Sequence, residues 1–192
     1  MDRLDTFLLA FHVIVAVTDH TDLARRLGEE LRDRGETIAV AESCTGGLVG
    51  AAITAVPGAS DYFDRGFVTY AYGAKQAELG VSREALDEHG AVSAPVAREM
   101  ARGARDVAGT TWAVATTGVA GPAGGSEETP VGTVYVAVAY AAPWGTERSS
   151  VTAERNEFDG DRTAVRERTV DLALRVVLEE MGATDVPESG GA

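Results

Sequence analysis

The hydrophobic pattern along the chain changes repeatedly between a helical and an extended period. Leu23, Leu27 and Leu31 recur at helical spacing and predict an amphipathic helix from residue 21 until Gly35. A short apolar run over residues 37–41 predicts a buried strand, and the small apolar residues that follow predict a tightly packed helix up to residue 56. This part of the chain therefore predicts a strand, a sharp polar turn and a helix.

The same alternation continues to the end of the chain. Further strands are expected at residues 66–71, 112–117 and 131–141, and residues 149–157 are expected to pair antiparallel with the last of these. Helices are expected around Lys75 and Leu79, at residues 83–89, from Pro95 to about residue 107, and at residues 162–181. Alternating strands and helices with one hairpin predict an α/β fold, a single-domain α/β/α layered sandwich with a mixed, mostly parallel sheet.

The length of the chain favours one domain. Its 192 residues, 45% of them hydrophobic, are enough to bury one substantial core. We expect this domain at residues 21–182, preceded by an N-terminal extension of unknown role at 1–20 and followed by a flexible tail at 183–192. The apolar stretch 7–17 is too short to cross a bilayer and lacks the flanks of a signal peptide, which predicts a cytoplasmic protein without membrane contact. An extra strand or helix on the core is the alternative for this stretch.

Charge and composition exclude several classes of partner. A formal net charge of -13 repels phosphate backbones, so nucleic acid is not an expected partner. The acidic, lysine-poor composition is typical of proteins from a high-salt cytoplasm. Cys44 is the only cysteine and has no intramolecular disulfide partner, and the histidines show no metal-ligand spacing with it. We therefore expect no disulfide and no metal site.

Ser43 is the first candidate for chemistry. It lies between the predicted buried strand and the next helix, where backbone N–H groups can bind an oxyanion or a phosphate. Gly46 and Gly47 have no Cβ and let a ligand approach the backbone. Two alternatives stay open: Ser43 or Thr45 serves only to cap the helix, or Cys44 is the nucleophile and not just a packed thiol.

A serine nucleophile needs a base, and Lys75 is the candidate. His89 precedes no evident carboxylate partner, and the Gly-x-Ser-x-Gly nucleophile elbow is absent. Lys75 is the only lysine among 17 basic residues. Arginine cannot act as a base, so a base position is one where arginine cannot replace lysine. The alternative is an ordinary surface lysine. Tyr70 and Tyr72 precede Lys75, and either phenol can relay a proton or pack in the core; the sequence does not choose between them.

The loop over residues 118–125 is a candidate anion site. Its glycines leave several backbone N–H groups unobstructed, and such nests bind anions. The loop matches neither the dinucleotide fingerprint nor the P-loop. Arg162, at the start of the last predicted helix, is expected either to pair with a phosphate or to form a surface ion pair.

Taken in order, several segments resemble the CinA C-terminal family over about residues 21 to 182. They are Ala41-Glu42-Ser43-Cys44-Thr45-Gly46-Gly47, Arg65-Gly66-Phe67-Val68-Thr69-Tyr70 with Lys75 after it, Glu88-His89-Gly90-Ala91-Val92-Ser93, Thr117-Gly118-Val119-Ala120-Gly121-Pro122 through Gly124-Gly125-Ser126-Glu127, Pro130-Val131-Gly132-Thr133-Val134 and Gly160-Asp161-Arg162. Any one of these motifs is weak, whereas their common order is specific.

The resemblance implies an amidohydrolase that converts nicotinamide mononucleotide to nicotinic acid mononucleotide and ammonia. It implies Ser43 as nucleophile, Lys75 as base and Tyr70, in preference to Tyr72, as the supporting phenol. No cofactor and no metal are expected. The partner is then a small pyridine nucleotide, and a homo-oligomer is possible. The residues expected to bind the substrate are Thr45, Gly46, Gly47, Thr117, Gly118, Gly121, Gly124, Gly125 and Arg162.

The alternative is a regulatory domain of the competence or damage-inducible type that binds a nucleotide without turnover. Many relatives carry this domain behind a larger domain that resembles a nucleotide pyrophosphatase. The chain has no room for such a domain, so that second activity is not expected.

Overall fold

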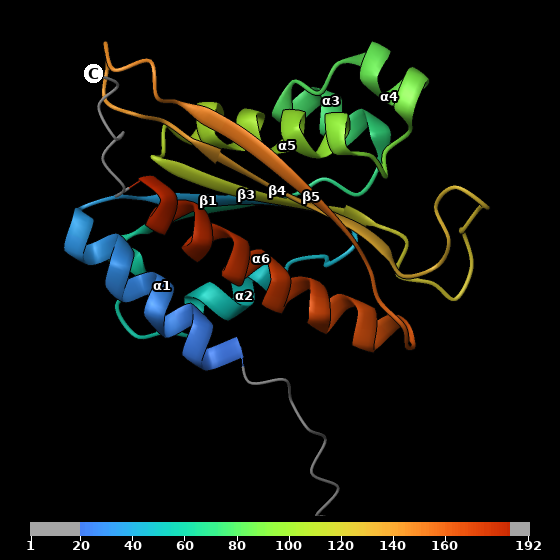
Figure 1. Cartoon of the computed structure of the whole chain (residues 1–192), viewed down its shortest axis with the longest axis horizontal. Helices are drawn as coiled ribbons and strands as arrows, with labels where there is room; N and C mark the ends of the chain where they lie inside the picture. Colours follow the sequence, from blue (N-terminus) through green and yellow to red (C-terminus); the bar gives the residue numbers. More distant parts are fainter. Residues whose placement is uncertain (1–19, 185–192) are drawn as a thin grey trace, which may run out of the picture.

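The computed structural model describes residues 20–184, which form a five-stranded sheet between two layers of helices (Figure 1). The strand order is β2-β1-β3-β4-β5. The strands are β1 (Ile38–Glu42), β2 (Phe63–Val68), β3 (Trp112–Gly118), β4 (Thr133–Tyr140) and β5 (Ser150–Glu157). β1 pairs in parallel with β2 and β3, whereas β4 pairs antiparallel with β3 and β5. Only β4 is therefore reversed, which confirms the predicted mixed, mostly parallel sheet.

Helices cover both faces of the sheet. One layer contains α1 (His20–Arg34), α2 (Leu48–Thr54) and α6 (Arg162–Thr184), and the other contains α3 (Tyr72–Leu79), α4 (Arg83–His89) and α5 (Ala94–Ala108). In Figure 1, α6 and α5 lie on opposite sides of the sheet. The α/β/α arrangement is thus confirmed. A short 3-10 helix, Ala59–Asp61, was not predicted.

The two faces of the central strands bury different side chains. In β1, Ile38 and Val40 pack in the core under α1, α2 and α6, whereas Ala39 and Ala41 pack in the core under α5. This alternation follows from the period of two along a strand. β3 and β4 repeat it, with large residues on the first face and alanines on the second. The small alanine side chains let α5 pack close to the sheet.

Two element boundaries differ from the predictions. The second strand begins at Phe63 and ends at Val68, three residues earlier than expected, because its pairing with β1 begins where the Ile38 N–H donates to the Tyr62 carbonyl. It is an edge strand with exposed charged residues, so its hydrophobic pattern is weak. The helix expected to start near residue 45 starts at Leu48, since Gly46 and Gly47 both have positive φ.

The ends of the domain extend slightly beyond the predicted limits. His20 already belongs to α1, and α6 continues to Thr184. The rest of the expected extension and tail, residues 1–19 and 185–192, lies outside the described residues. Between residues 20 and 184, no helix has the length and hydrophobicity needed to span a membrane.

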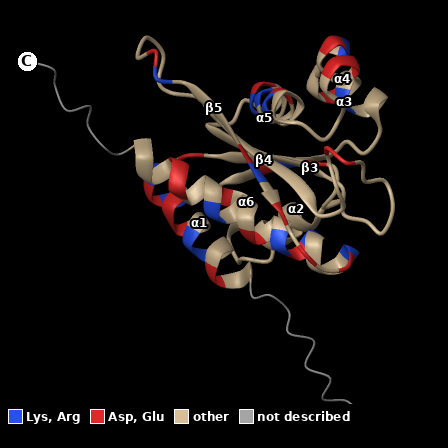
Figure 2. Cartoon of the chain, turned by 45° about the vertical axis from the view of Figure 1, so that its right-hand side comes forward, with Lys and Arg blue, Asp and Glu red and all other residues tan. Residues whose placement is uncertain are grey.

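Charged side chains lie on the helices and the sheet periphery. Figure 2 shows acidic and basic residues along α1, α4, α5 and α6, whereas β3 and β4 contain none. The negative surface therefore surrounds a neutral sheet centre, and a local cation can set the potential of a site at the strand ends.

Candidate active site

The predicted chemistry lies at the carboxyl ends of the parallel strands. Ser43 follows β1, and its N–H donates to the carbonyl of Thr116 in β3 at 3.0 Å. Thr69 follows β2, and its N–H donates to the carbonyl of Glu42 at 2.9 Å. Three strand ends thus meet around Ser43. Open α/β sheets bind their ligands at this edge.

The structure places Lys75 against Ser43. The Lys75 Nζ lies 3.0 Å from the Ser43 Oγ, although 32 residues separate them in the chain. The lysine side chain is completely buried and Ser43 is nearly so. The alternative of an ordinary surface lysine is therefore wrong.

The other partners of Lys75 are backbone carbonyls. Its Nζ donates to the carbonyl of Thr69 at 2.7 Å and to that of Tyr70 at 3.3 Å. The Ser43 hydroxyl oxygen and the two carbonyls can accept all three hydrogens of the ammonium; when Lys75 is neutral, the carbonyls can take its two hydrogens and its lone pair can then accept from the Ser43 hydroxyl. Burial lowers the pKa of Lys75, which favours this neutral form. The site can therefore remove a proton from Ser43.

Cys44 is a poor nucleophile in this environment. The thiol is buried, with 5% of the residue exposed. Burial raises the pKa of Cys44 to about 12, with a smaller contribution from the Glu42 carboxylate. Because only the thiolate attacks, the thiol is essentially inert near neutral pH. Of the two adjacent candidates, Ser43 has the better geometry.

Helix α2 is capped by Glu42 and not by Ser43 or Thr45. The buried Glu42 carboxylate accepts hydrogen bonds from the backbone N–H groups of Gly47 at 2.9 Å, Val49 at 3.1 Å and Gly50 at 2.8 Å. These bonds and the helix dipole stabilise the charge. The capping alternative for Ser43 is therefore wrong, and the N–H of Gly47, a residue expected to bind the substrate, already donates to Glu42.

Thr45 and Gly46 form the remaining part of the turn. The Thr45 hydroxyl shares a 2.7 Å hydrogen bond with that of Thr116, and the Thr45 carbonyl accepts from Arg166. Gly46 has φ of 60°, a region that favours glycine. Within residues 20–184, the N–H groups of Thr45 and Gly46 have no acceptor, so they are the candidate donors to an oxyanion.

The two tyrosines point to different partners. Tyr70 is 63% exposed, and its phenol oxygen accepts from the Arg162 guanidinium at 3.4 Å. Tyr72 begins α3, and its phenol oxygen accepts from the Ala91 N–H at 3.3 Å. Alternation would place both side chains on one face only if the strand continued through Tyr72. It ends at Val68, so the alternation does not continue to them.

Arg162 connects the glycine loop to Tyr70. Its guanidinium also donates to the Gly121 carbonyl at 2.8 Å. Among residues 20–184, no carboxylate lies within ion-pair distance of the Arg162 guanidinium. The alternative that Arg162 forms a surface ion pair is therefore wrong. A hollow of about 520 Å³ lies beside Arg162, lined also by Ala120, Pro122, Val131, Gly160, Asp161 and Thr163. Arg162 is therefore available to an anion in this hollow.

The glycines of the predicted nest have different structural roles. Gly118 ends β3, where a Cβ would lie 2.7 Å from the Thr133 carbonyl oxygen. Gly125 packs as closely on Val131, whereas a Cβ on Gly124 would make only an ordinary contact with Val119, at 3.8 Å. The Thr117 hydroxyl donates to the Ala91 carbonyl. Close packing explains Gly118 and Gly125 without a ligand, and their binding role stays a prediction.

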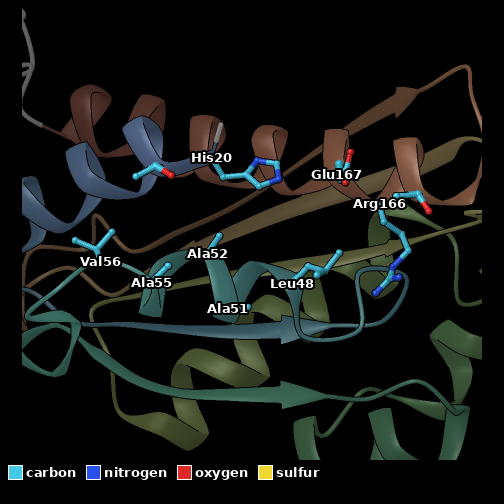
Figure 3. Close-up of a pocket in the computed structure, with 10 residues that line it drawn as sticks. His20, Leu48, Ala51, Ala52, Ala55, Val56, Arg166 and Glu167 are labelled. Carbon is cyan, nitrogen blue, oxygen red and sulfur yellow. The ribbon is translucent and has the colours of Figure 1, made fainter. Parts of the chain in front are cut away.

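A second hollow, of about 390 Å³, lies between α1, α2 and α6 (Figure 3). It is mostly apolar and lined by His20, Thr21, Leu48, Ala51, Ala52, Ala55, Val56, Thr163, Arg166 and Glu167. Neither Ser43 nor Lys75 lines it. The hollow is therefore separate from the candidate active site, and Arg166 connects the two.

Sequence reasoning missed Glu42, Thr116 and Arg166. Glu42 was visible as a carboxylate just before a helix start, a position that suits capping. Arg166 lies one turn after Arg162 and so on the same face of α6. The hydrogen bond between Thr116 and Thr45 depends on strand order and left no local signal.

Comparison with known proteins gives the family. The model of the CinA C-terminal domain matches residues 20–181. The chain is 49% identical over 159 residues to a nicotinamide-nucleotide amidohydrolase PncC of Pseudomonas putida, covering 83% of this chain and 95% of that protein. It is 50% identical over 162 residues to a CinA-like protein of Geobacter sulfurreducens, covering 84% of this chain but 37% of that protein.

The solved structures agree with this assignment. The competence/damage inducible protein CihA from Agrobacterium tumefaciens superposes with a TM-score of 0.78 at 41% identity, covering 84% of this chain and 94% of that one. The family match, the sequence relatives and the shared fold all cover the same domain. The chain belongs to the CinA C-terminal domain family.

Proposed function

We propose that this protein hydrolyses the carboxamide of nicotinamide mononucleotide to nicotinic acid mononucleotide and ammonia, with Ser43 as nucleophile and Lys75 as base. The observation that carries the mechanism is the buried Lys75 amine, 3.0 Å from the Ser43 hydroxyl and otherwise bonded to two carbonyls. The likeness to nicotinamide-nucleotide amidohydrolases supports the reaction.

The first half of the reaction forms an acyl-enzyme. Neutral Lys75 takes the proton of Ser43 while the Oγ attacks the carboxamide carbon. The carbonyl oxygen becomes an oxyanion, which the N–H groups of Thr45 and Gly46 stabilise. When the C–N bond breaks, the nitrogen takes a proton from Lys75, directly or relayed through the Tyr70 phenol, and leaves as ammonia.

The second half releases the acid. A water molecule gives a proton to Lys75 and attacks the ester carbon, and the same N–H groups hold the second oxyanion. The bond to the Ser43 Oγ then breaks and the oxygen recovers its proton from Lys75. Nicotinic acid mononucleotide leaves, and the enzyme is unchanged.

The phosphate of the substrate needs local positive charge on an acidic protein. Arg162 supplies it beside the 520 Å³ hollow and the glycine loop at Gly121 and Gly124. A guanidinium has five N–H donors, so Arg162 can bind a phosphate while it also donates to the Gly121 carbonyl and the Tyr70 phenol. We place this reaction in the cytoplasm.

Ammonia release from nicotinamide mononucleotide by the purified protein tests this proposal. We expect the amount of ammonia released to match the amount of nicotinic acid mononucleotide formed, in both high and low salt. Calorimetric binding of nicotinamide mononucleotide without product after long incubation would contradict it and favour the non-catalytic regulatory domain.

The pH dependence of turnover should follow Lys75. Because burial lowers the pKa of Lys75, the active neutral amine forms at a lower pH than for an exposed lysine. We expect kcat/KM to rise with pH through this lowered pKa. Steady-state rates measured from acidic to alkaline pH check this, and a rate that rises only at the usual lysine pKa would contradict it.

Tyr70→Phe should reduce turnover more than Tyr72→Phe does. The Tyr70 phenol lies beside Arg162, and a proton-relaying group of this kind contributes roughly 100-fold or more. The Tyr72 phenol is engaged by the Ala91 N–H, so its loss should leave kcat unchanged. Kinetics of the two matched variants decide the point. Equal effects would remove Tyr70 from the mechanism.

A further inference from the structure

Arg166 joins helix α6 to the turn that carries Ser43. One of its terminal nitrogens, Nη2, donates to the Thr45 carbonyl at 2.7 Å. A Cβ on Gly46 would lie 3.4 Å from the same nitrogen, so the guanidinium packs directly against Gly46. Figure 3 shows the side chain extending from α6 towards the loop between β1 and α2. A single charged group thus holds this short peptide segment.

The bond to Arg166 fixes the direction of the Gly46 N–H. The Thr45 carbonyl and the Gly46 N–H belong to one peptide unit, and a trans peptide points these groups in opposite directions. Because the carbonyl faces α6, the N–H faces away from α6. Lys75 belongs to α3, which covers the opposite face of the sheet. The N–H is therefore directed to the side from which Lys75 approaches Ser43.

Glu42 leaves few other donors for this role. Its carboxylate occupies the N–H groups of Gly47, Val49 and Gly50, three of the four backbone donors over residues 47–50 at the start of α2. Glycine at residue 46 also gives the peptide rotational freedom that a larger residue would not have. The turn consequently depends on an external contact to hold the Gly46 N–H in one direction.

We propose that Arg166 is a positioning residue, which orients the Thr45–Gly46 peptide so that the Gly46 N–H stabilises the oxyanion formed when Ser43 attacks. The inference rests on the proposed function, since it needs Ser43 to be the nucleophile. Arg166 does not touch the reacting atoms; it acts through the peptide it holds.

Arg166→Ala compared with Arg168→Ala tests the inference. Arg168 is the matched control because it lies on the same helix and donates to the Asp159 carbonyl at 2.7 Å. Loss of one oxyanion donor costs roughly 100-fold or more in kcat, and we expect a fall of that order in Arg166→Ala with KM unchanged. Arg168→Ala should keep the kcat of the wild type. Added guanidinium at low concentration should restore part of the kcat of Arg166→Ala, which a general loss of structure would not allow.

A second readout uses a fluorophosphonate probe and no nucleotide. The Ser43 Oγ forms a bond to phosphorus, the P–F bond breaks, fluoride leaves and Lys75 takes the serine proton, while the phosphoryl oxygen occupies the oxyanion position. Labelling should be slower in Arg166→Ala and unchanged in Arg168→Ala. A wild type that labels at Ser43 without releasing ammonia would overturn the proposed function, and the labelling rates would still decide the role of Arg166.

Several results would overturn the inference. The first is that the two alanine variants have equal kcat values and equal labelling rates. The second is that Arg166→Ala changes only KM, which would make Arg166 a substrate-binding residue. The third is that guanidinium does not restore the kcat of Arg166→Ala. If Arg166→Ala does not fold, Arg166→Lys decides the matter. Its ammonium can still donate to the Thr45 carbonyl, so most of the kcat should remain, and a lysine variant that folds but has lost turnover would contradict the proposal.

Discussion

Ser43→Ala should abolish ammonia release from nicotinamide mononucleotide while the protein stays folded. Removing the nucleophile of a serine hydrolase lowers kcat by roughly 10⁴-fold or more, because no other group can form the acyl-enzyme. Ser43 is a small residue at the end of β1 whose backbone N–H, and not its hydroxyl, holds the strand ends together. Alanine keeps that bond. Circular dichroism and thermal unfolding check the fold, and an ammonia assay measures the loss.

Cys44→Ala is the matched control for this prediction. The neighbouring thiol is buried and its pKa is raised to about 12, so its loss should leave kcat unchanged. The cavity left by the sulfur should lower the free energy of unfolding only slightly, by about 1 kcal/mol. Activity retained in Ser43→Ala and lost in Cys44→Ala would reverse the assignment of the nucleophile.

Lys75→Met should lower kcat by roughly 10³-fold or more, because it removes the base that activates Ser43. Methionine has a stem of similar volume and fits the buried site of Lys75. Lys75→Arg should be equally inactive, since a guanidinium does not deprotonate, and should also be less stable because it buries a permanent charge. Turnover by a folded Lys75→Arg variant would exclude Lys75 as the base.

The stability of these proteins gives an independent check on Lys75. Burial lowers its folded-state pKa, so between that value and the pKa of the unfolded chain the unfolded state binds more protons. The free energy of unfolding therefore rises with pH across this window. Lys75→Met should lack this increase. Denaturant titrations of both proteins at a series of pH values measure the difference, and parallel curves would contradict a lowered pKa.

Most of the fold followed from local patterns. The apolar runs of β1, β3 and β4, and the helical spacing of leucines in α1, gave elements close to those observed. Among the strands, the largest displacement was in β2, an edge strand whose exposed Asp64 and Arg65 hide its pattern. Edge strands bury little, so hydrophobic periodicity identifies them poorly.

The candidate site followed from the sequence less completely. Ser43 was predicted from its place between a strand and a helix, and Lys75 from being the only lysine in the chain. The resemblance to the CinA C-terminal family joined the two, and the family is confirmed. Their catalytic roles remain predictions, to be decided by the variants described above.

The sequence by itself determined which segments are strands and helices and which residues are chemically able to act, because both depend on local periodicity and side-chain type. Only the tertiary structure decided that Lys75 lies against Ser43 and that Arg166 holds Thr45. The contact of Lys75 with Ser43 and that of Arg166 with Thr45 join residues far apart in the chain. They depend on the strand order and on which face each helix covers, and no local pattern encodes either.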